Sequence, residues 1–308
     1  MDRALECVEH SFRAQDRGQG VNRSRERILL PHTSLHYMAA ALPDEKLLGM
    51  KIYTASRGVL RFVVLLFDAE NGGLLALMEA DHLGRIRTGA ASGIATKYLA
   101  RSEAARVGII GTGRQGRTQL EAVARVRKLS AVLAFSRTEE TRTKFCREMS
   151  ARLGIAVEPA ASAEASARFG DIVITATNST QPLVRGEWLR PGAHVNAIGA
   201  NMANRREVDD ATLARAKVIA VDSLAQAKIE AGDLIRGLAA TPHGWDGVVE
   251  LCGIVAGARA GRTSDEDVTI FKSSGIALWD VASAGYIYGK ALERGKGKPF
   301  KTWGEESV

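Results

Sequence analysis

The sequence has few cysteines and no long apolar run. Its three cysteines, Cys7, Cys146 and Cys252, are scattered and in no CxxC spacing, which argues against a disulfide framework and against a metal site. Apolar runs such as VVLLF at Val63 to Phe67 are far shorter than the roughly 18 residues of a membrane span. Because the N-terminus is charged rather than signal-like, we expect a cytoplasmic protein with no membrane partner.

The charged residues also form no concentrated patch. The chain has 308 residues, of which 45% are hydrophobic and 25% charged, with a formal net charge of +7. This composition is typical of a globular protein large enough for two domains. The basic residues run along the whole chain, with a local cluster only at Asn22 to Arg27, and no nucleic-acid motif accompanies them. We therefore expect no nucleic-acid partner; steep salt-dependent binding to DNA would be needed to revive one.

The first third of the chain is patterned for an antiparallel sheet. An amphipathic stretch from Asp2 to Gln15 predicts a helix. The segments RILL, LHYMA, LLGMKIYTA and LRFVVLLFD predict strands, and DAENGG before LLALMEA is a hairpin signal. Small residues at helical spacing from Gly84 to Arg101 then predict a closely packed helix that joins two domains.

From Val107 the pattern changes to strands and helices in alternation. The segments VGII, AVLAF, DIVITAT, AHVNAIG and KVIAV are continuous apolar runs separated by amphipathic helices. This predicts an α/β fold with a doubly wound parallel sheet covered on both faces. Near Gly261 the alternation ends, and we expect the strand VTIF (Val268 to Phe271) and a helix from about Gly275 to Glu293 to return to the N-terminal domain.

A glycine-rich turn follows the first strand of the parallel region. Gly111, Gly113 and Gly116 have GxGxxG spacing in GTGRQG. The first glycine permits a tight turn, the second lets the backbone approach a pyrophosphate, and the third lets helix and strand pack closely. Three glycines can also mark only a tight connection. Here they open a series of parallel units, which favours a dinucleotide site.

The second strand of this region ends without the acidic residue that binds the ribose hydroxyls of NAD. The sequence there is AFSRT, with Ser136 and Arg137 at the strand end. A hydroxyl and a guanidinium suit a 2′-phosphate, so we expect NADP(H) to be preferred, with NAD(H) possible. The alternative is that Arg137 is a solvated loop residue.

Three basic residues stand among apolar or small residues. Lys51 lies between Met50 and Ile52, Arg27 precedes ILLP, and Arg87 lies in the small-residue helix. A cation directed inward needs an anionic partner, and a substrate carboxylate would serve. Taken singly, each is better explained as a surface charge, and the residues alone do not show that the three converge.

Four longer stretches are informative together. They are LFDAENGGLLALMEADHLGRIRTGAASGIATKYLAR, IIGTGRQG, PGAHVNAIGANMANRREVD and VTIFKSSGIALWD. These stretches resemble the ornithine cyclodeaminase and mu-crystallin family, and the similarity runs from about Arg27 to Lys290. The resemblance implies a Rossmann domain over residues 101–263. It also implies a mixed α+β domain, made of residues 1–100 and 264–308, that binds substrate and forms a homodimer.

The resemblance also assigns residues to a site. It implies that Arg27, Lys51 and Arg87 bind the carboxylate of a small amino or imino acid. Besides the three glycines, it implies contacts to the cofactor at Arg114, Gln115, Ser136, Thr177, the backbone of Ile198 and Gly199, Arg205 and Ser273.

One departure from the family pattern bears on the reaction. Ornithine cyclodeaminases carry an Asp after the NAIG strand, where it interacts with the side-chain amine of ornithine and moves protons; here the matching residue is Asn201. A neutral amide cannot act as a base, so the resemblance favours reduction over cyclodeamination. The FSRT segment is similar to the NRT of the NADPH-using mu-crystallin ketimine reductases.

The sequence therefore predicts an NAD(P)H-dependent reductase of a ketimine or cyclic imino carboxylic acid of the pyrroline-2-carboxylate type. Lys51 and Asn201 are the candidate catalytic residues, with Lys51 either an acid or a charge clamp. The alternatives are ornithine cyclodeaminase, an amino acid dehydrogenase similar to alanine dehydrogenase, and a non-enzymatic carrier that binds NADPH.

Overall fold

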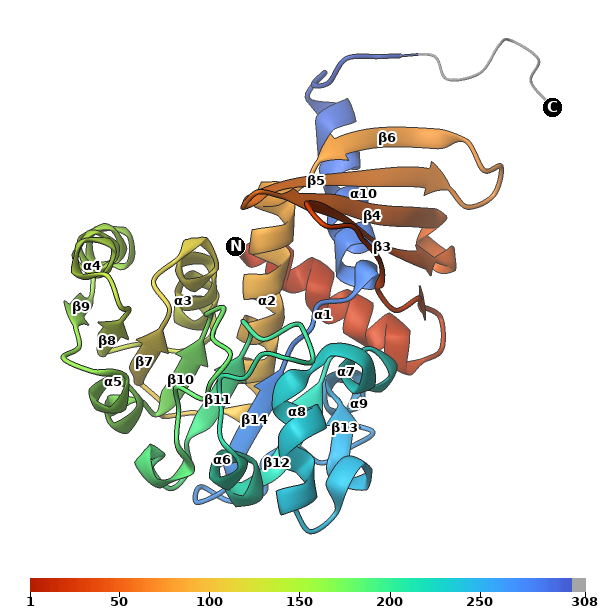
Figure 1. Ribbon diagram of the computed structural model, residues 1–308. Helices are drawn as coiled ribbons and strands as arrows, with labels where there is room; N and C mark the ends of the chain where they lie inside the picture. Colours follow the sequence, from red (N-terminus) through yellow and green to blue (C-terminus); the bar gives the residue numbers. More distant parts are fainter. Residues whose placement is uncertain (301–308) are drawn as a thin grey trace. The chain divides into compact units, whose positions relative to one another are not determined.

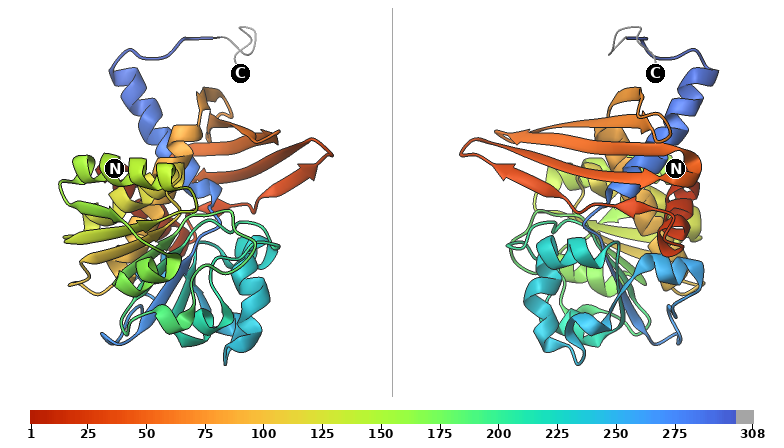
Figure 2. Two further views of the ribbon diagram at one scale, coloured as in Figure 1. Left: turned by 60° about the vertical axis from the view of Figure 1, so that its left-hand side comes forward. Right: turned by 90° about the vertical axis from the view of Figure 1, so that its right-hand side faces the viewer.

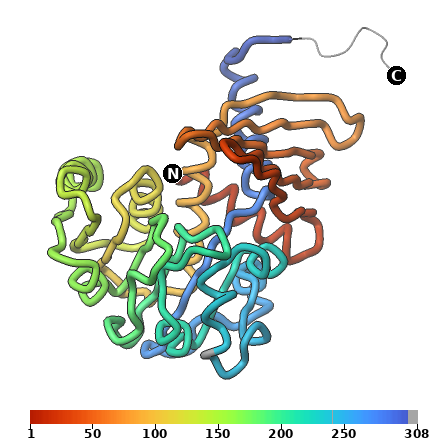
Figure 3. The backbone as a smooth tube through the Cα atoms, in the orientation of Figure 1, coloured from red at the N-terminus to blue at the C-terminus, as the bar shows by residue number. Residues whose placement is uncertain are grey.

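The chain folds into two compact units. The computed structural model describes residues 1–300, and the tube of Figure 3 follows the chain through both units. The larger unit consists of Met1–Asp16 and Arg85–Gly275, and the smaller unit of Arg17–Gly84 and the residues from Ile276 onward. The boundaries expected from the sequence differ because the N-terminal helix and most of the joining helix pack within the larger unit.

The larger unit is built on an eight-stranded parallel sheet (Figure 1). The strands are ordered β13-β12-β14-β11-β10-β7-β8-β9. The chain runs outward from β7 through β8 to β9, and β10 then returns to the other side of β7. In open α/β sheets, ligands bind at the carboxyl ends of the strands at such a switch point. The bounds are β7 (Arg106–Ile110), β8 (Ala131–Phe135), β9 (Ala156–Pro159), β10 (Ile172–Thr175), β11 (His194–Ala197), β12 (Ala216–Val221), β13 (Val248–Glu250) and β14 (Val268–Lys272).

Apolar clusters bury both faces of this sheet, which confirms the predicted doubly wound fold. In β10, Ile172 and Ile174 belong to one cluster, with α3 and α4, whereas Val173 belongs to the other, with α5 to α8. Figures 1 and 2 show these helices on the two sides of the sheet. The helices are α1 (Asp2–Asp16), α2 (Asp81–Leu99), α3 (Arg114–Val126), α4 (Glu139–Leu153), α5 (Ala163–Phe169), α6 (Asp210–Arg215), α7 (Leu224–Glu230), α8 (Gly232–Gly237) and α9 (Leu251–Ala256).

The prediction for β14 was wrong. We expected this strand to return to the N-terminal domain, but it lies inside the parallel sheet between β11 and β12. All five of its residues are buried. The physical reason is visible in the sequence, because Val268, Ile270 and Phe271 put apolar side chains on both faces, which is typical of a strand covered on both faces.

The smaller unit is an antiparallel sheet packed against the C-terminal helix α10 (Ala277–Glu293). The strand order is β1-β3-β4-β5-β6, with β2 also paired to β3, and the DAENGG hairpin joins β5 to β6 as predicted. Helix α10 contacts β3, β4 and β5, so the last helix returns to this unit as expected (Figure 3). The strands are β1 (Val21–Asn22), β2 (Glu26–Leu29), β3 (Thr33–Leu42), β4 (Leu47–Ser56), β5 (Val59–Asp68) and β6 (Leu74–Glu79).

Short 3-10 turns complete the described chain at Pro43–Glu45, Gly186–Trp188, Leu238–Ala240 and Gly244–Gly247.

Glycine lets α10 approach the sheet closely, because a Cβ on Gly285 would lie 2.3 Å from a methyl carbon of Leu47. Among residues 1–300, no helix has the length and apolar character needed to cross a bilayer.

Candidate active site

The glycine turn lies between β7 and α3, next to the switch point. Gly111 has a φ of +109°, and a Cβ there would lie 2.5 Å from the Ala176 carbonyl oxygen. A Cβ on Gly116 would lie 2.3 Å from the carbonyl oxygen of Gly111, whereas one on Gly113 would meet no atom within 4 Å. The turn is therefore closed at its first and third glycines and open at the second. This shape fits a pyrophosphate bound against the N-terminal amides of α3.

The first turn of α3 carries no acidic residue that would repel an anion. Arg114 is exposed there and Gln115 is half-buried. Behind the turn, the Arg117 guanidinium donates to the Thr112 carbonyl oxygen at 2.9 Å and lies 2.6 Å from the Glu148 carboxylate. Its hydrogen bond lowers the pKa of Glu148. The ion pair of Arg117 and Glu148 thus stabilises the glycine turn through the Thr112 carbonyl group.

Cations dominate the end of β8. The Ser136 hydroxyl accepts from the Thr112 hydroxyl at 2.7 Å and donates to the Thr138 carbonyl oxygen at 3.2 Å. Because its one proton is used there, Ser136 offers a ligand only acceptor capacity. Arg137 is exposed, and Arg142 is half-buried and donates to the Ser136 carbonyl oxygen at 2.9 Å. Sequence reasoning missed Arg142, which lies one turn into α4.

The loops after β10 and β11 touch through Thr177 and Gly199. A Cβ on Gly199 would lie 1.9 Å from the Thr177 carbonyl oxygen, and the adjacent Ile198 is buried. The Glu207 carboxylate connects the two loops: one oxygen accepts from the Thr177 amide at 2.7 Å and the other from the Gly199 amide at 2.6 Å. Burial raises the pKa of Glu207, and the Lys272 ammonium opposes that rise. Glu207 lies in the quoted RREVD segment but was not named from the sequence.

A second buried carboxylate holds the turn after β14. The Ser273 hydroxyl donates to Asp222 at 3.0 Å, and the same carboxylate oxygen accepts from the amides of Ser274 at 2.8 Å and Gly275 at 2.6 Å. Burial raises the pKa of Asp222. Gly275 has a φ of +82°, and a Cβ there would lie 2.8 Å from a guanidinium nitrogen of Arg87, which is itself buried. Asp222 thus fixes the turn against which Arg87 packs.

Asn201 and Arg205 lie in the loop between β11 and α6, and both are half-buried. The Arg205 amide donates to the Met202 carbonyl oxygen at 2.9 Å. A Cβ on Gly232 would lie 2.1 Å from the Arg205 carbonyl oxygen, so α8 packs directly against this loop. Both residues therefore belong to the same edge of the larger unit as Gly199.

In the smaller unit, Lys51 has a buried counterion. Its ammonium lies 3.2 Å from the Asp280 carboxylate of α10, and neither side chain is more than 5% exposed. The ammonium also lies 5.6 Å from the centroid of the Phe62 ring. Sequence reasoning did not name Asp280, although an acidic residue within the apolar segment IALWDVA is a signal that a buried cation faces it.

Strand β2 and the residue before it place two arginines on one face of the sheet. Arg27 is half-buried and pairs with His36 of β3. Arg25, two residues earlier and therefore on the same face, is 4% exposed and donates to the Met38 sulfur at 3.8 Å. Met38 is the β3 residue paired with Lys51. Arg25, which was not predicted, thus contacts the residue that pairs with Lys51, whereas Arg27 lies two residues further along the strand.

Three rings line the same face beside these cations. The His36 ring stacks on Tyr53 with centroids 4.3 Å apart, and Tyr53 packs on Phe62 at 4.9 Å. Burial, with the charges of Arg27 and Arg25, lowers the pKa of His36 to about 4. His36 is therefore neutral near pH 7 and forms part of an aromatic surface rather than a further charge.

Sequence comparison decides the family. The family model described as "Ornithine cyclodeaminase/mu-crystallin family" matches residues 1–295. The chain belongs to this family. The sequence prediction of family membership is thereby confirmed, over a longer range than the stretches that first indicated it.

Members of the ornithine cyclodeaminase/mu-crystallin family resemble the chain over most of its length. A Delta(1)-pyrroline-2-carboxylate reductase from Bacillus cereus is 39% identical over 267 residues, which are 85% of this chain and 78% of that protein. The structure of Thermococcus litoralis Delta(1)-pyrroline-2-carboxylate reductase with NADH and L-proline has a TM-score of 0.93 at 36% identity, covering 97% of this chain and 96% of that one. An archaeal alanine dehydrogenase dimer with bound NAD has a TM-score of 0.90 at 34% identity, covering 98% and 95%.

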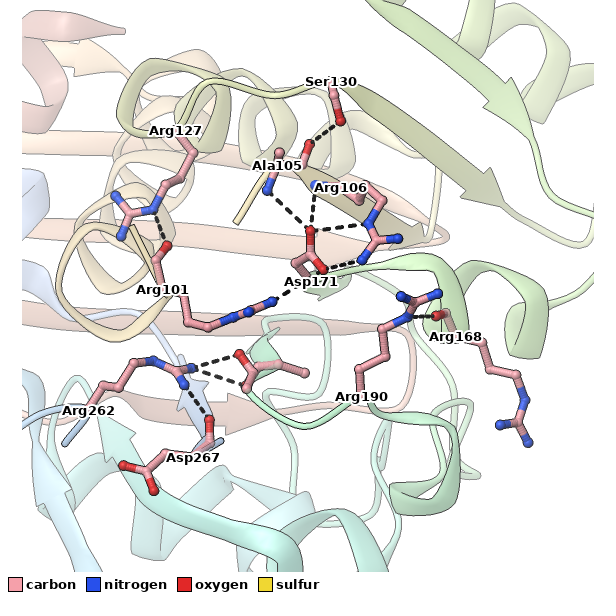
Figure 4. Close-up of polar contacts among 12 residues, drawn as sticks. Arg101, Ala105, Arg106, Arg127, Ser130, Arg168, Asp171, Arg190, Arg262 and Asp267 are labelled. Atoms are coloured by element: carbon pink, nitrogen blue, oxygen red, sulfur yellow. Dashed lines mark hydrogen bonds and ion pairs between the residues drawn. The ribbon is translucent and has the colours of Figure 1, made fainter. Parts of the chain in front are cut away.

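A separate charged cluster lies at the amino ends of the strands (Figure 4). Asp171 accepts from the amides of Ala105 and Arg106 and lies 2.7 Å from the Arg106 guanidinium. Arg127 donates to the carbonyl oxygen of Arg101 and to carbonyls of the last turn of α2. These contacts satisfy backbone amide and carbonyl groups at helix and strand ends, at the edge of the sheet opposite the glycine turn.

No group of three or more His, Cys, Asp or Glu in the described part of the chain could hold a metal ion.

Proposed function

We propose that this chain reduces the C=N bond of a cyclic imino carboxylic acid of the pyrroline-2-carboxylate type, giving a cyclic amino acid such as proline. The observation that carries the proposal is the buried Lys51 ammonium, fixed by Asp280 on the same sheet face as Arg25. A cationic surface of this kind, edged by aromatic rings, suits a small apolar ring bearing a carboxylate. The names of the Bacillus and Thermococcus relatives support this substrate class.

Basic side chains bind and orient the substrate carboxylate. We assign this role to Lys51, Arg27 and Arg87, as the family resemblance implies, and add Arg25 because it is more deeply buried than Arg27. Fixing the carboxylate fixes the face that the imine carbon presents. The rings of His36, Tyr53 and Phe62 supply apolar contact for the substrate ring.

Two groups differ in what they can do with a proton. Lys51, paired with the Asp280 carboxylate, clamps the substrate carboxylate and, as an ammonium, can donate a proton toward the imine nitrogen. Asn201 can only hydrogen-bond a nitrogen, because its amide does not take up a proton near pH 7. The protonated imine is the better hydride acceptor, and the reaction ends at the amino acid.

The larger unit binds a nicotinamide dinucleotide, which supplies the hydride when bound. The open Gly113 position and the α3 amides hold its pyrophosphate. Arg137 and Arg142 favour NADP(H) over NAD(H) by the positive charge at the β8 end, and Ser136, which offers only acceptor capacity, meets a ribose hydroxyl. The remaining contacts come from Gly111, Arg114, Gln115, Gly116, Thr177, Ile198, Gly199, Arg205 and Ser273.

Three substrate sets separate the candidate activities. The purified chain is incubated with pyrroline-2-carboxylate and NADPH or NADH, with pyruvate plus ammonia and either reduced cofactor, and with L-ornithine and NAD⁺. The proposal expects rapid cofactor oxidation only with the first set. Faster turnover of pyruvate plus ammonia would favour an alanine dehydrogenase, and proline formation from ornithine without net cofactor consumption a cyclodeaminase. Tight NADPH binding without any turnover would favour a carrier.

The chain also presents a surface for a second copy of itself. On the sheet face opposite Lys51, the paired residues Ala39, Met50, Leu65 and Leu77 form an apolar row across four strands. Leu77 is 56% exposed. We propose a homodimer formed through this face, in line with the dimeric alanine dehydrogenase that the chain resembles.

A further inference from the structure

We propose that Glu207 is a positioning residue for the cofactor that acts through Thr177: its carboxylate accepts the hydrogen bond of the Thr177 hydroxyl, so Thr177 meets the dinucleotide only as an acceptor. The inference rests on the proposed function in one respect, the binding of a nicotinamide dinucleotide by the larger unit. It concerns which atoms of that dinucleotide the site selects.

The Glu207 carboxylate is fully used by the two loops it joins. One oxygen accepts from the Thr177 amide at 2.7 Å and from the Thr177 hydroxyl at 2.8 Å. The other accepts from the amides of Gly199 at 2.6 Å and Ala200 at 3.2 Å. Four donors match the four acceptor sites of an ionised carboxylate. Glu207 is 0% exposed, so water does not compete for these bonds.

The ion pair between Asp233 and Lys272 holds the backbone of Glu207 in place. One oxygen of Asp233 accepts from the Glu207 amide at 2.6 Å and from the Val208 amide at 3.0 Å. The other lies 3.1 Å from the Lys272 ammonium, which donates to the Ala197 carbonyl oxygen at 3.3 Å. The backbone of Glu207 is therefore tied to the carboxyl ends of β11 and β14, so its side chain holds a fixed direction.

This arrangement decides the polarity of the Thr177 hydroxyl. A hydroxyl has one proton and two lone pairs. The proton is directed to Glu207, and the Ser179 amide donates to one lone pair at 3.2 Å. One lone pair remains, so Thr177 can accept from a ligand and cannot donate to it.

A second hydroxyl, on Ser273 after β14, has its proton directed to a buried carboxylate in the same way. In the sheet, β14 is two strands away from β10. The Ser273 hydroxyl donates to the fully buried Asp222 carboxylate at 3.0 Å, and that carboxylate also accepts from the Ser274 and Gly275 amides. Ser273 thus also offers only acceptor capacity. Two hydroxyls at the carboxyl edge of the sheet are set by buried carboxylates to face a donor.

An acceptor-only hydroxyl selects among the groups of the dinucleotide. Phosphate oxygens and carbonyl oxygens would oppose its lone pair, and such a pairing is unfavourable. The donors on the nicotinamide half are the ribose hydroxyls and the carboxamide N–H groups. Thr177 therefore binds one of these donors, and Glu207 acts without touching the cofactor.

The test is a thermodynamic cycle on NADH binding, read by the fluorescence of NADH without any imine present. The variants are Thr177→Val, Glu207→Gln and the double variant, with Thr177→Ser to restore the hydroxyl. We expect T177V and E207Q each to weaken binding about tenfold, T177S to bind as the unchanged chain does, and the double variant to bind no more weakly than T177V. Asp171→Asn is the matched control, because Asp171 also accepts from two backbone amides, but at the opposite edge of the sheet; D171N should lower Tm and leave the Kd for NADH within about twofold.

An NADH analogue with an acetyl group in place of the carboxamide distinguishes the two donors. If the loss in T177V disappears with the analogue, the donor is the carboxamide; if it persists, the donor is a ribose hydroxyl. Effects of T177V and E207Q that multiply in the double variant, or NADH binding unchanged in E207Q, would overturn the role of Glu207. Should E207Q fail to fold, equal binding by T177V, T177S and the unchanged chain would overturn it as well. Absence of NADH binding by the unchanged chain would contradict the proposed function and this inference together.

Discussion

The Lys51 ammonium and the Asp280 carboxylate face each other at 3.2 Å inside the smaller unit, between a central strand and the C-terminal helix. Breaking a buried pair leaves an uncompensated charge, which costs about 3–5 kcal/mol, whereas replacing both partners by apolar residues can be nearly neutral. The pair thus has two separable consequences, one for stability and one for the reaction.

Asp280→Asn should lower the free energy of unfolding by about 3 kcal/mol, because Lys51 keeps its charge and loses its counterion. The double variant K51M/D280L should recover most of that stability and still reduce the imine at least about 100-fold more slowly, because the carboxylate clamp is gone. Denaturant unfolding and steady-state kinetics measure the two effects. Wild-type kinetics in the double variant would refute a role for Lys51.

Arg25 and Arg27 offer a comparison within one strand region. Because Arg25 is buried and adjoins the row of Lys51, Arg25→Met should raise KM for the imine by about 10- to 100-fold, with a smaller rise for Arg27→Met. Steady-state kinetics on the two variants measure this order. A larger effect at Arg27 would reverse the assignment and restore the residue implied by the family resemblance.

Cofactor preference should respond to charge at the end of β8. Ser136→Asp supplies an acceptor for ribose hydroxyls and repels a 2′-phosphate, so the ratio of kcat/KM for NADPH to that for NADH should fall by about 100-fold. Arg142→Met should weaken the binding of NADPH and leave the binding of NADH nearly unchanged. Equal losses with both cofactors in R142M would mean that Arg142 serves only to support the loop.

Acid stability should depend on His194, at the amino end of β11. The side chain is fully buried, its ring bonds the Thr269 hydroxyl at 3.0 Å, and burial with the Arg262 charge lowers its pKa to about 3. The unfolded chain therefore binds this proton first as pH falls. The stability contributed by the neutral ring is complete above about pH 6.5 and is lost as pH falls toward about 3.

His194→Asn replaces the ring by a group that does not titrate and can still bond Thr269. The free energy of unfolding of this variant should fall less steeply between about pH 6.5 and 4, measured by urea denaturation at each pH. An acid slope identical to that of the unchanged chain would show that His194 is not the group responsible.

Association should depend on the apolar face opposite Lys51. Leu77→Lys places a charge on the edge strand β6 of that face and should convert a dimer to a monomer in sedimentation analysis. The control is Ile229→Lys, because Ile229 is similarly exposed, at 52%, but belongs to the larger unit. A dimer that survives L77K and dissociates with I229K would place the interface elsewhere.

Local sequence pattern predicted the fold more completely than the site. The parallel sheet, the β5–β6 hairpin and the glycine turn follow from periodicity and from glycines, which act over a few residues. The error at β14 arose from expecting the chain to leave the sheet after Gly261, although Val268, Ile270 and Phe271 already put apolar side chains on both faces of that strand.

The missed site residues act across long sequence separations. Glu207 bonds Thr177 thirty residues away, and Asp280 meets Lys51 across 229 residues. Such pairs depend on which strand ends become neighbours, and no short pattern encodes that. Both acids nevertheless lie in segments that carried the family resemblance, RREVD and IALWD, where an acidic residue inside an apolar or loop-closing segment indicates a buried partner.

Oxidation of NADPH or NADH with pyrroline-2-carboxylate, followed by identification of the product, decides whether the chain is an imine reductase. We expect rapid turnover with proline formed in a 1:1 ratio to the cofactor oxidised, and a kcat/KM for this imine far above that for pyruvate plus ammonia. Tight cofactor binding without turnover of the imine, or preferential turnover of pyruvate plus ammonia, would contradict it.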